Sequence, residues 1–441
     1  MNEQGCAFCS HRQGSVVTGD SMERPPMATG DSFLSPYRVL DLTDEKGYMC
    51  GKILGGLGAE VIKIEPPNGD PGRSIGPFVD DKPGLDRSLF WMALNVGKKS
   101  ITLDLEKNEG RKIFGRLVES ADFVVESFKP GYLNELGLGY EDLRKINPGI
   151  VVTSLTPYGQ TGPYKDYHAS DIVCWAGCGY MWLCGLPGRA PLRISVPQAY
   201  LHGGAEGAMG TMVAFWHRQK TGQGQHVDVS ITESAMWQCF GAHASWDMNQ
   251  MILQRQGAFR YYGAYKIRFL YPCKDGYVLF MLLGGHIGAR GQKALAEWMD
   301  QEGMSDEFLK NFEWDAFDAS TYSDEMARKL EPFFERFFLT KTKHELFEGA
   351  LKMQYLLTPV NTVQDLIESP HFAARDFWMD IDHPELNICF RYPGAPFKSS
   401  EVSWTMDRRA PQIGEHNGEI YSKGLGFSDR ETRALEKAGV I

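Results

Sequence analysis

The chain has 441 residues, of which 43% are hydrophobic and 23% are charged, and its formal net charge is −10. This composition excludes a disordered or fibrous protein and predicts a large core shared among roughly two or three domains. Acidic and basic residues are interleaved, which argues against a nucleic-acid partner, although a local basic patch could still bind an anion.

Short β-branched runs alternate with helical segments in the first third of the chain. We expect strands at residues 38–42, 61–65, 100–105, 123–126 and 150–154. Helices are expected between them, at residues 48–57, 109–120 and 140–146. This repetition of strand, helix and strand predicts a parallel sheet covered by helices.

The segment after the first strand, Thr43–Tyr48, lacks the Gly-x-Gly-x-x-Gly fingerprint of dinucleotide-binding folds, so NAD is not an expected ligand. A phosphate-binding Walker loop and a Gly-x-Ser-x-Gly elbow are absent as well. The glycines that end at Gly58 follow the first helix, where glycine commonly serves as a C-terminal cap.

A long helix rich in small residues is expected at about 199–220, followed by a turn and a strand at 226–230. Four glycines share one face of this helix: Gly203, Gly204, Gly207 and Gly210. Their spacing favours close packing against a neighbouring element over the approach of an extended ligand. His202 and Glu206 also share a face, and they could form an ion pair, ligate a metal or lie in a cleft.

The pattern changes at about residue 258, where a hairpin at 271–281 is followed by charged helices. This change predicts a smaller domain at 258–358 and a large α/β domain formed by 36–257 and 359–441. The glycines of Gly284-Gly-His-Ile-Gly288 suit either a loop that approaches a ligand or a tight structural turn.

The first 35 residues, 1–35, are polar and lack the apolar segment of a signal peptide, so we expect a flexible extension. Cys6, Cys9 and His11 resemble part of a zinc site, but no second ligand pair lies nearby, and a solvated tail is the favoured interpretation. No apolar run reaches the roughly 18 residues of a membrane span. The nine cysteines suit reduced thiols in a cytoplasm.

Six stretches of the sequence, in order, resemble the family III CoA-transferases. They are Val39–Thr43, Leu57–Pro66, Lys98–Asp104, Asp122–Gly131, Lys220–Gln225 and Pro411–His416. The resemblance implies a Rossmann-like large domain, a smaller α+β domain and two chains interlocked as a dimer. It also implies CoA thioesters as substrates, with no tightly bound cofactor and no metal.

The resemblance also implies a set of CoA-binding residues. Members of the family bind CoA through the loop after the first strand, the Lys-Lys-Ser-Ile strand, the Glu-x-Phe-x-Pro-Gly turn and the segment before a glycine-rich apolar run. Carried over, these stretches point to Glu45, Lys46, Leu103, Ser127, Phe128, Lys129, His168 and Asp171. Aromatic and apolar surface would hold the adenine, while Lys and His would meet the phosphates. Gly284, Gly285 and His286 would form the substrate loop.

The nucleophile of the family is an aspartate about twenty residues before the Lys-Thr-Gly-x-Gly-Gln turn, where it forms covalent intermediates that divide one slow exchange into easier steps. In this chain that position holds Tyr200, and no Asp occurs between Asp171 and Asp228. A phenol with a pKa near 10 cannot form the same mixed anhydride.

Three interpretations of Tyr200 compete. The preferred one is a non-nucleophilic subunit that pairs with a homologous catalytic subunit, as in the succinyl-CoA:benzylsuccinate CoA-transferases of anaerobic toluene degradation, whose first loop and Gly-Gly-His loop are similar. The second is an active homodimer in which Asp171 or Glu206 is a displaced nucleophile. The third is an acyl-CoA racemase, a class that uses an Asp preceded by His and a second His upstream. Asp171 fits the Asp position, but Ser170 precedes it and residues 137–147 contain no histidine, so two-base proton exchange lacks a base.

We therefore expect a cytoplasmic CoA-transferase subunit. It would move CoA from an acyl-CoA such as succinyl-CoA to a carboxylic acid, such as benzylsuccinate or a similar aryl-dicarboxylate. An alternative from a different class is an acyl-CoA-binding scaffold without turnover.

Overall fold

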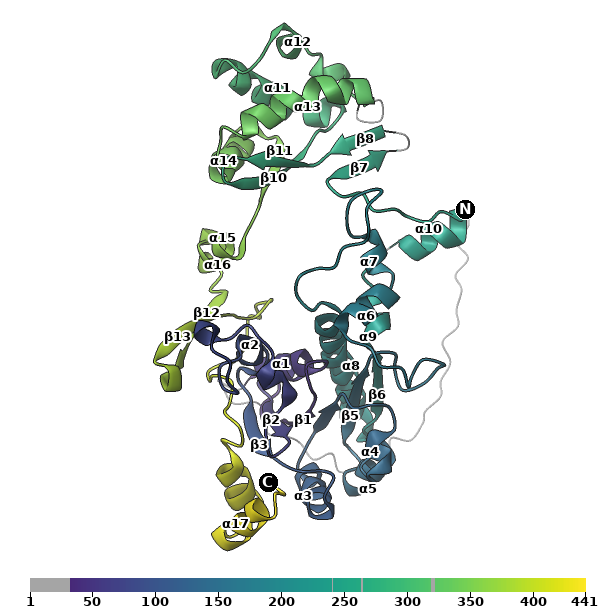
Figure 1. Ribbon diagram of the computed structural model, residues 1–441, viewed down its shortest axis with the longest axis vertical. Coiled ribbons are helices and arrows are strands. Elements are labelled where there is room, and N and C mark those ends of the chain that lie inside the picture. The colour runs from purple at the N-terminus through teal and green to yellow at the C-terminus, as the bar shows by residue number, and fades with distance from the viewer. Residues whose placement is uncertain (1–31, 240, 263–264, 319–321) are drawn as a thin grey trace, which may run out of the picture. The chain divides into compact units, whose positions relative to one another are not determined.

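The computed structural model describes residues 32–239, 241–262, 265–318 and 322–441 (Figure 1). The chain separates into two units at Asp31 and Ser32, and all that follows concerns the second unit. The predicted Cys6, Cys9 and His11 cluster and almost all of the 1–35 extension lie outside the described residues.

A six-stranded sheet in the order β3-β2-β1-β4-β5-β6, parallel throughout, is the first part of the fold. Its strands are β1 (Arg38–Leu42), β2 (Glu60–Glu65), β3 (Lys99–Thr102), β4 (Phe123–Glu126), β5 (Val151–Thr156) and β6 (His226–Ser230). Each coincides with a predicted strand, although β3 ends earlier than expected. The first strand, β1, lies in the middle of the sheet. The chain adds β2 and β3 on one side of it and β4, β5 and β6 on the other, so the direction of strand addition reverses between β1 and β4.

Helices cover both faces of this sheet, so strands β1 to β5 are buried along nearly their whole length. On one face Val39 and Phe123 pack against α1 (Tyr48–Gly56) and α8 (Ala199–Thr221). On the other face Leu40 packs in the hydrophobic core that the sheet forms with α3, α4 and α5. These three helices and the neighbouring ones are α2 (Leu89–Asn95), α3 (Asn108–Glu119), α4 (Tyr132–Glu135), α5 (Tyr140–Ile146), α6 (Asp171–Gly177), α7 (Tyr180–Leu183), α9 (Ile231–Met236) and α10 (Ala242–Asn249), with short 3-10 turns at Pro71–Ser74 and Val79–Asp81.

The glycines of α8 allow close packing, as predicted. A Cβ added to Gly203 would lie 2.7 Å from Ile231, one on Gly204 would lie 2.7 Å from Met49, and one on Gly207 would lie 2.8 Å from Leu155. Gly58, with φ of +98°, follows the last turn of α1 and confirms the predicted glycine cap.

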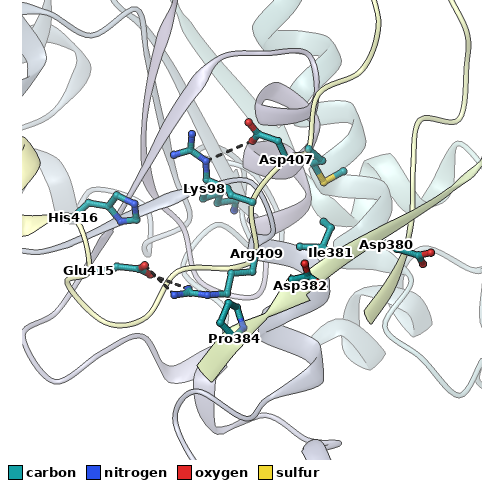
Figure 2. A pocket seen from close by; sticks show the side chains of 11 residues that line it. Lys98, Asp380, Ile381, Asp382, Pro384, Asp407, Arg409, Glu415 and His416 are labelled. Atoms are coloured by element: carbon teal, nitrogen blue, oxygen red, sulfur yellow. Dashed lines mark hydrogen bonds and ion pairs between the residues drawn. The ribbon is translucent and has the colours of Figure 1, made fainter. Parts of the chain in front are cut away.

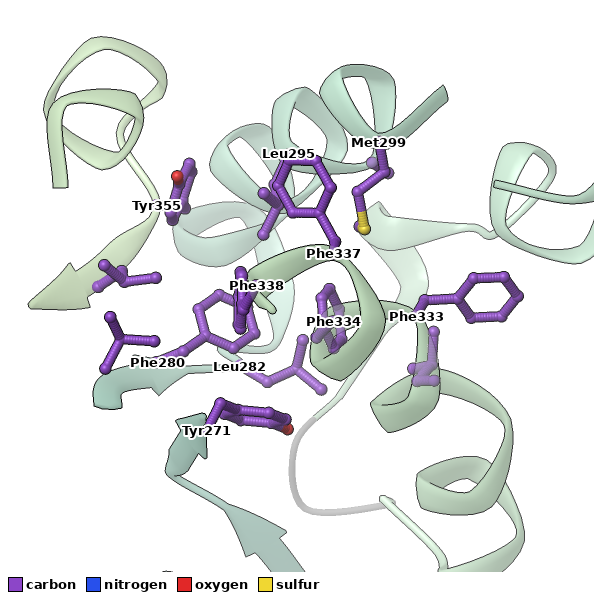
Figure 3. Close-up of a cluster of buried hydrophobic side chains, with 14 of the residues drawn as sticks. Tyr271, Phe280, Leu282, Leu295, Met299, Phe333, Phe334, Phe337, Phe338 and Tyr355 are labelled. Atoms are coloured by element: carbon purple, nitrogen blue, oxygen red, sulfur yellow. The ribbon is translucent and has the colours of Figure 1, made fainter. Parts of the chain in front are cut away.

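The described part of residues 258–360 contains an antiparallel sheet of order β11-β10-β9, a separate β7–β8 pair and four α-helices. Their bounds are β7 (Phe259–Tyr262), β8 (Tyr265–Arg268), β9 (Leu270–Cys273), β10 (Gly276–Met281), β11 (Leu356–Val360), α11 (Gly285–Gln301), α12 (Glu307–Lys310), α13 (Asp324–Phe338) and α14 (Lys343–Met353), with a 3-10 turn at Trp314–Ala316. The predicted hairpin is β9–β10. Figure 3 shows the core of this segment, in which the rings of Phe280 and Phe334 lie 4.9 Å apart. The division into domains stays a prediction.

The last segment returns to the edge strand of the parallel sheet. It contains α15 (Val363–Ile367), α16 (Pro370–Ala374), the antiparallel hairpin β12 (Trp378–His383) and β13 (Ile388–Pro393), a 3-10 turn at Pro384–Leu386, a π-helix at Gly418–Gly424 and α17 (Asp429–Lys437). The N–H of Thr102 donates to Asn417 Oδ1 at 3.0 Å, and the N–H of Asp104 donates to the Val440 carbonyl at 2.8 Å. The C-terminal segment therefore lies beside β3, the outer strand of the sheet.

Candidate active site

Two loops meet where the strand order reverses, which is where open α/β sheets bind their ligands. One loop follows β1 and contains Glu45 and Lys46, and the other follows β4 and contains Ser127. Ser127 Oγ donates to Asp44 Oδ1 at 2.8 Å, and the Asp44 N–H donates to Ser127 Oγ at 2.9 Å. The structure thus brings together two of the segments that the sequence assigned to CoA binding.

The lysines of these two loops form ion pairs that water can reach. Lys46 pairs with Asp44, and Lys129 Nζ lies 3.6 Å from Glu135, where both side chains are about two-thirds exposed. Pairs of this kind contribute little to stability, so a phosphate could replace either carboxylate at small cost. Burial, assisted by the neighbouring Asp44, raises the pKa of Glu45.

Aromatic surface lies next to the second loop. The ring of Phe128 packs on that of Tyr132 at 4.7 Å, and both are partly buried against the core. Leu103, in contrast, follows β3, two strands away from β1 in the sheet order. It is only 3% exposed, and its N–H donates to the Glu65 carbonyl at 2.8 Å. Its predicted contact with CoA stays a prediction.

Glu126 is a residue of this site that the sequence reasoning missed. It ends β4, is 5% exposed, and accepts hydrogen bonds from the Phe128 N–H, at 2.7 Å, and from the Ser154 hydroxyl. Burial raises its pKa to about 7. The signal available in the sequence was a carboxylate that ends an otherwise apolar strand.

Tyr200 lies in the first turn of α8 and is 7% exposed. Its N–H donates to Asp171 Oδ1 at 3.0 Å, and its hydroxyl donates to the Ala169 carbonyl at 3.3 Å. Burial raises the pKa of the phenol, and the nearby Cys174 and Glu45 raise it further. The phenol therefore keeps its proton at neutral pH and cannot serve as an anionic nucleophile.

The two fallback carboxylates differ in their surroundings. Asp171 is half-buried at the start of α6, and its Oδ1 is already occupied by the Tyr200 N–H. Glu206 is half-buried in α8. It lies six residues after Tyr200, which corresponds to about 9 Å along the helix axis. His168 is exposed in the segment before α6. His202 stacks on Trp175 with a centroid separation of 6.4 Å, and the ion pairs of the described residues do not join it to Glu206.

The predicted substrate loop forms the N-terminus of α11. Gly285 has φ of +66°, and its N–H donates to the Phe317 carbonyl at 2.7 Å, so the turn has a structural role. His286 is 94% exposed and lies 3.8 Å from Asp315. Gly284 precedes them as the N-terminal cap.

A separate pocket of about 540 Å³ lies between the β12–β13 hairpin and residues 406–416 (Figure 2). Each of its lysines and arginines is paired: Lys98 with Asp41 at 2.7 Å, Arg408 with Asp407 at 3.6 Å, and Arg409 with Glu385 and Glu415 at 2.9 Å. None of the predicted site residues lines it. This pocket thus offers no unpaired lysine or arginine to a phosphate.

Within the described residues, no group of three or more His, Cys, Asp or Glu side chains is arranged to hold a metal ion. In the same residues no helix combines the length and the hydropathy that crossing a bilayer requires.

Residues 34–417 match the family model described as CoA-transferase family III. The chain is 38% identical to subunit BbsE of succinyl-CoA:(R)-benzylsuccinate CoA-transferase from Thauera aromatica, over 92% of this chain and 98% of that protein. It is 31% identical to the succinyl-CoA–D-citramalate CoA-transferase of Chloroflexus aurantiacus, over 96% and 100% of the two chains. A CAIB/BAIF family protein from Brucella suis has a similar crystal structure, with a TM-score of 0.77, 28% identity, and 89% and 99% coverage of the two chains.

Proposed function

Because this chain belongs to CoA-transferase family III, we propose that it takes part in moving CoA from succinyl-CoA to an aryl-substituted dicarboxylic acid such as benzylsuccinate. In this proposal it is the subunit without the nucleophile. The observation that carries the proposal is that Tyr200 is a buried and protonated phenol. The resemblance to the family implies an aspartate at this position.

The proposed division of labour follows from the chemistry. A carboxylate on the partner attacks the donor thioester, which forms a mixed anhydride and releases CoA as a thiolate. The thiolate attacks the anhydride at the enzyme carbonyl, which releases succinate and leaves an enzyme thioester. The acceptor carboxylate then repeats the two steps in reverse. On this chain the loops after β1 and β4 hold CoA, with Lys46 and Lys129 near its phosphates and Phe128 beside its adenine.

An exposed apolar stripe on α8 supports the presence of a partner chain. Met209, Val213 and Trp216 are 56%, 65% and 64% exposed, and their spacing places them on one helix face. Apolar surface of this kind commonly marks an interface. The relative from Thauera aromatica is itself named as one subunit of an enzyme. The proposed partner is a homologous chain with Asp at the Tyr200 position.

The seven described cysteines are all free thiols, which suits a reducing compartment, and we place the heteromer in the cytoplasm.

The decisive experiment measures transfer with and without the partner. The purified chain is incubated with succinyl-CoA and (R)-benzylsuccinate, and new CoA thioesters are separated by chromatography. We expect no product from the chain alone and product when the homologous subunit is added.

Two variants at Tyr200 locate the missing group. Tyr200→Asp should give the chain transfer activity of its own, because a carboxylate returns to the first turn of α8. The matched control Tyr200→Phe, which keeps the ring and removes only the hydroxyl, should stay inactive alone and should leave the activity of the heteromer unchanged. Robust transfer by the unmodified chain would refute the subunit proposal and would favour Asp171 or Glu206 as the nucleophile.

A further inference from the structure

A line of hydrogen bonds leads from the buried Glu126 to the surface of the parallel sheet. Glu126 and Ser154 are register partners on β4 and β5, and Ser154 is the partner of Asp228 on β6. Because side chains alternate along a strand, His226, two residues before Asp228, lies on the same face. The Ser154 hydroxyl is hydrogen-bonded to the Glu126 carboxyl, and its Oγ lies 2.9 Å from His226 Nε2. Side chains from three neighbouring strands therefore form one continuous line.

The two ends of this line differ in their access to water. Glu126 and Ser154 are 5% and 3% exposed, whereas His226 is exposed and stacks on the ring of Tyr140 at 5.9 Å. Partial burial lowers the pKa of His226, so at neutral pH the imidazole is uncharged, with one nitrogen as donor and the other as acceptor. Among the described residues no hydrogen bond or ion pair involves its Nδ1, so this nitrogen can exchange a proton with solvent.

The line keeps its hydrogen bonds in either protonation state of Glu126. When Glu126 is ionised, Ser154 donates to it and accepts from the Nε2–H of His226. When Glu126 is protonated, it donates to Ser154, which in turn donates to the bare Nε2. To pass from the first state to the second, Nδ1 takes a proton from solvent, Nε2 gives its proton to Ser154, and Ser154 gives its own to Glu126. One proton enters at the ring and one arrives at the carboxyl.

The buried end of the line faces the loops assigned to CoA. Lys46, from the loop after β1, favours the ionised form of Glu126, and Asp44, from the same loop, opposes it. The helices that cover this face, α4 and α5, add the apolar Leu133 and Leu143 to its core. A CoA phosphate that pairs with Lys46 would cancel the effect of the lysine and leave Asp44 unopposed, and this change favours the protonated carboxyl.

We propose that CoA binding at these loops drives the uptake of a proton by Glu126, and that His226 and Ser154 conduct this proton from solvent. The inference rests on the proposed function for the position of CoA. Glu126 is a positioning residue here, because it accepts the Phe128 N–H at 2.7 Å at the start of the second loop, and its added proton removes a negative charge near the bound phosphates. The affinity for CoA should therefore fall as the pH rises above 7, since binding then draws its proton from more alkaline solvent.

Isothermal titration calorimetry of CoA into the full-length chain at pH 8, in two buffers that differ in ionisation enthalpy, counts the protons taken up. About a tenth of Glu126 is protonated at this pH in the free chain, so we expect an uptake of about 0.3–0.5 proton per CoA. Glu126→Gln should remove this uptake, and Glu119→Gln, which changes an exposed carboxylate of α3, should keep it. The thiol and the phosphates of CoA are common to all three titrations and cancel in the comparison. The binding stoichiometry reports the folded fraction of each variant.

The substitution His226→Phe tests the path of the proton. Phenylalanine keeps the stack on Tyr140 and removes both ring nitrogens, so the amount of proton taken up should stay close to the parent value while the rate of uptake falls by about 10-fold or more. Stopped-flow mixing with CoA in weak buffer, followed with a pH indicator, measures this rate. The control is His371→Phe, which changes an exposed histidine of α16 and should take up its proton as fast as the parent.

Equal proton uptake by the parent and Glu126→Gln would overturn the inference. Uptake by His226→Phe as fast as that of the parent would overturn the path through the ring. Absence of CoA binding would contradict the position of CoA, and the inference would fall with it. CoA binding without a proton that depends on Glu126 would overturn the inference alone and leave the proposed function standing, so the two failures are distinguishable.

Discussion

Replacing Glu126 by Gln should change how the stability of this protein depends on pH. Glu126 is buried at the end of β4, and burial raises its pKa from 4.5 to about 7. The folded chain therefore holds a proton at this carboxyl over a pH range in which the unfolded chain has lost it. Gln keeps the shape of the side chain and an acceptor for the Phe128 N–H, and it carries no charge at any pH.

The sign and the size follow from proton linkage. Between pH 4.5 and about 7 the native state binds more protons than the unfolded state. The contribution of Glu126 to the free energy of unfolding is therefore fully present below pH 4.5 and is lost as the pH rises through about 7. A shift of this size corresponds to about 3 kcal/mol in total. Between pH 5 and pH 8, the stability of Glu126→Gln relative to the parent should therefore rise by about 2–3 kcal/mol.

Urea unfolding followed by tryptophan fluorescence, carried out at several pH values on both proteins, measures this difference. The control is Glu119→Gln, an exposed carboxylate at the end of α3, which should follow the parent at every pH. Other groups titrate in the same window, but they are common to all three proteins and cancel in the comparison. Parallel curves for Glu126→Gln and the parent would refute the reasoning.

Three further substitutions test the packing of the fold. Gly204→Ala should lower the melting temperature, because the new Cβ would lie 2.7 Å from a side chain of α1. The clash costs about 1–3 kcal/mol, which exceeds the gain of about 1 kcal/mol in helix propensity. Gly418→Ala is the control and should not lower the melting temperature, because no atom lies within 4 Å of the new Cβ. Arg73→Met should cost about 3–5 kcal/mol in urea unfolding, because it leaves the fully buried Glu65 carboxylate without its partner, whereas a loss below about 1 kcal/mol would contradict a buried pair. Phe334→Ala should cost about 3–5 kcal/mol of unfolding free energy in the core of residues 258–358, and a neutral result would contradict the packing in Figure 3.

The sequence predicted the strands of the parallel sheet and the helices α1, α3, α5 and α8, because their signals are local. Phe123–Glu126 is a short β-branched run, and the glycines of α8 have helical spacing. The lateral order of the strands could not be predicted in the same way, because it depends on pairings between residues far apart in the chain. The neighbours β1 and β4, for example, are separated in the chain by β2, β3 and the three α-helices α1, α2 and α3.

Part of the candidate site was also predicted, because the motifs that indicate it are short and local. Glu45, Lys46 and Ser127 were assigned by resemblance, and the structure places their loops side by side. Glu126 was missed because the burial of a carboxylate is decided by side chains from neighbouring strands, which the sequence does not place next to it.

The glycine face of α8 has a consequence for the order in which this protein folds. Each glycine lowers helix propensity by about 1 kcal/mol relative to alanine, so the four glycines together disfavour the isolated helix by about 4 kcal/mol. Helix α8 therefore depends on packing against α1, β5, β6 and α9, and it should form only after those elements have assembled. Native-state hydrogen exchange should then show the amides of α8 losing protection together with, or before, those of β5 and never after them. The first turn of α8, which carries Tyr200, would be among the last parts of the sheet region to acquire its structure.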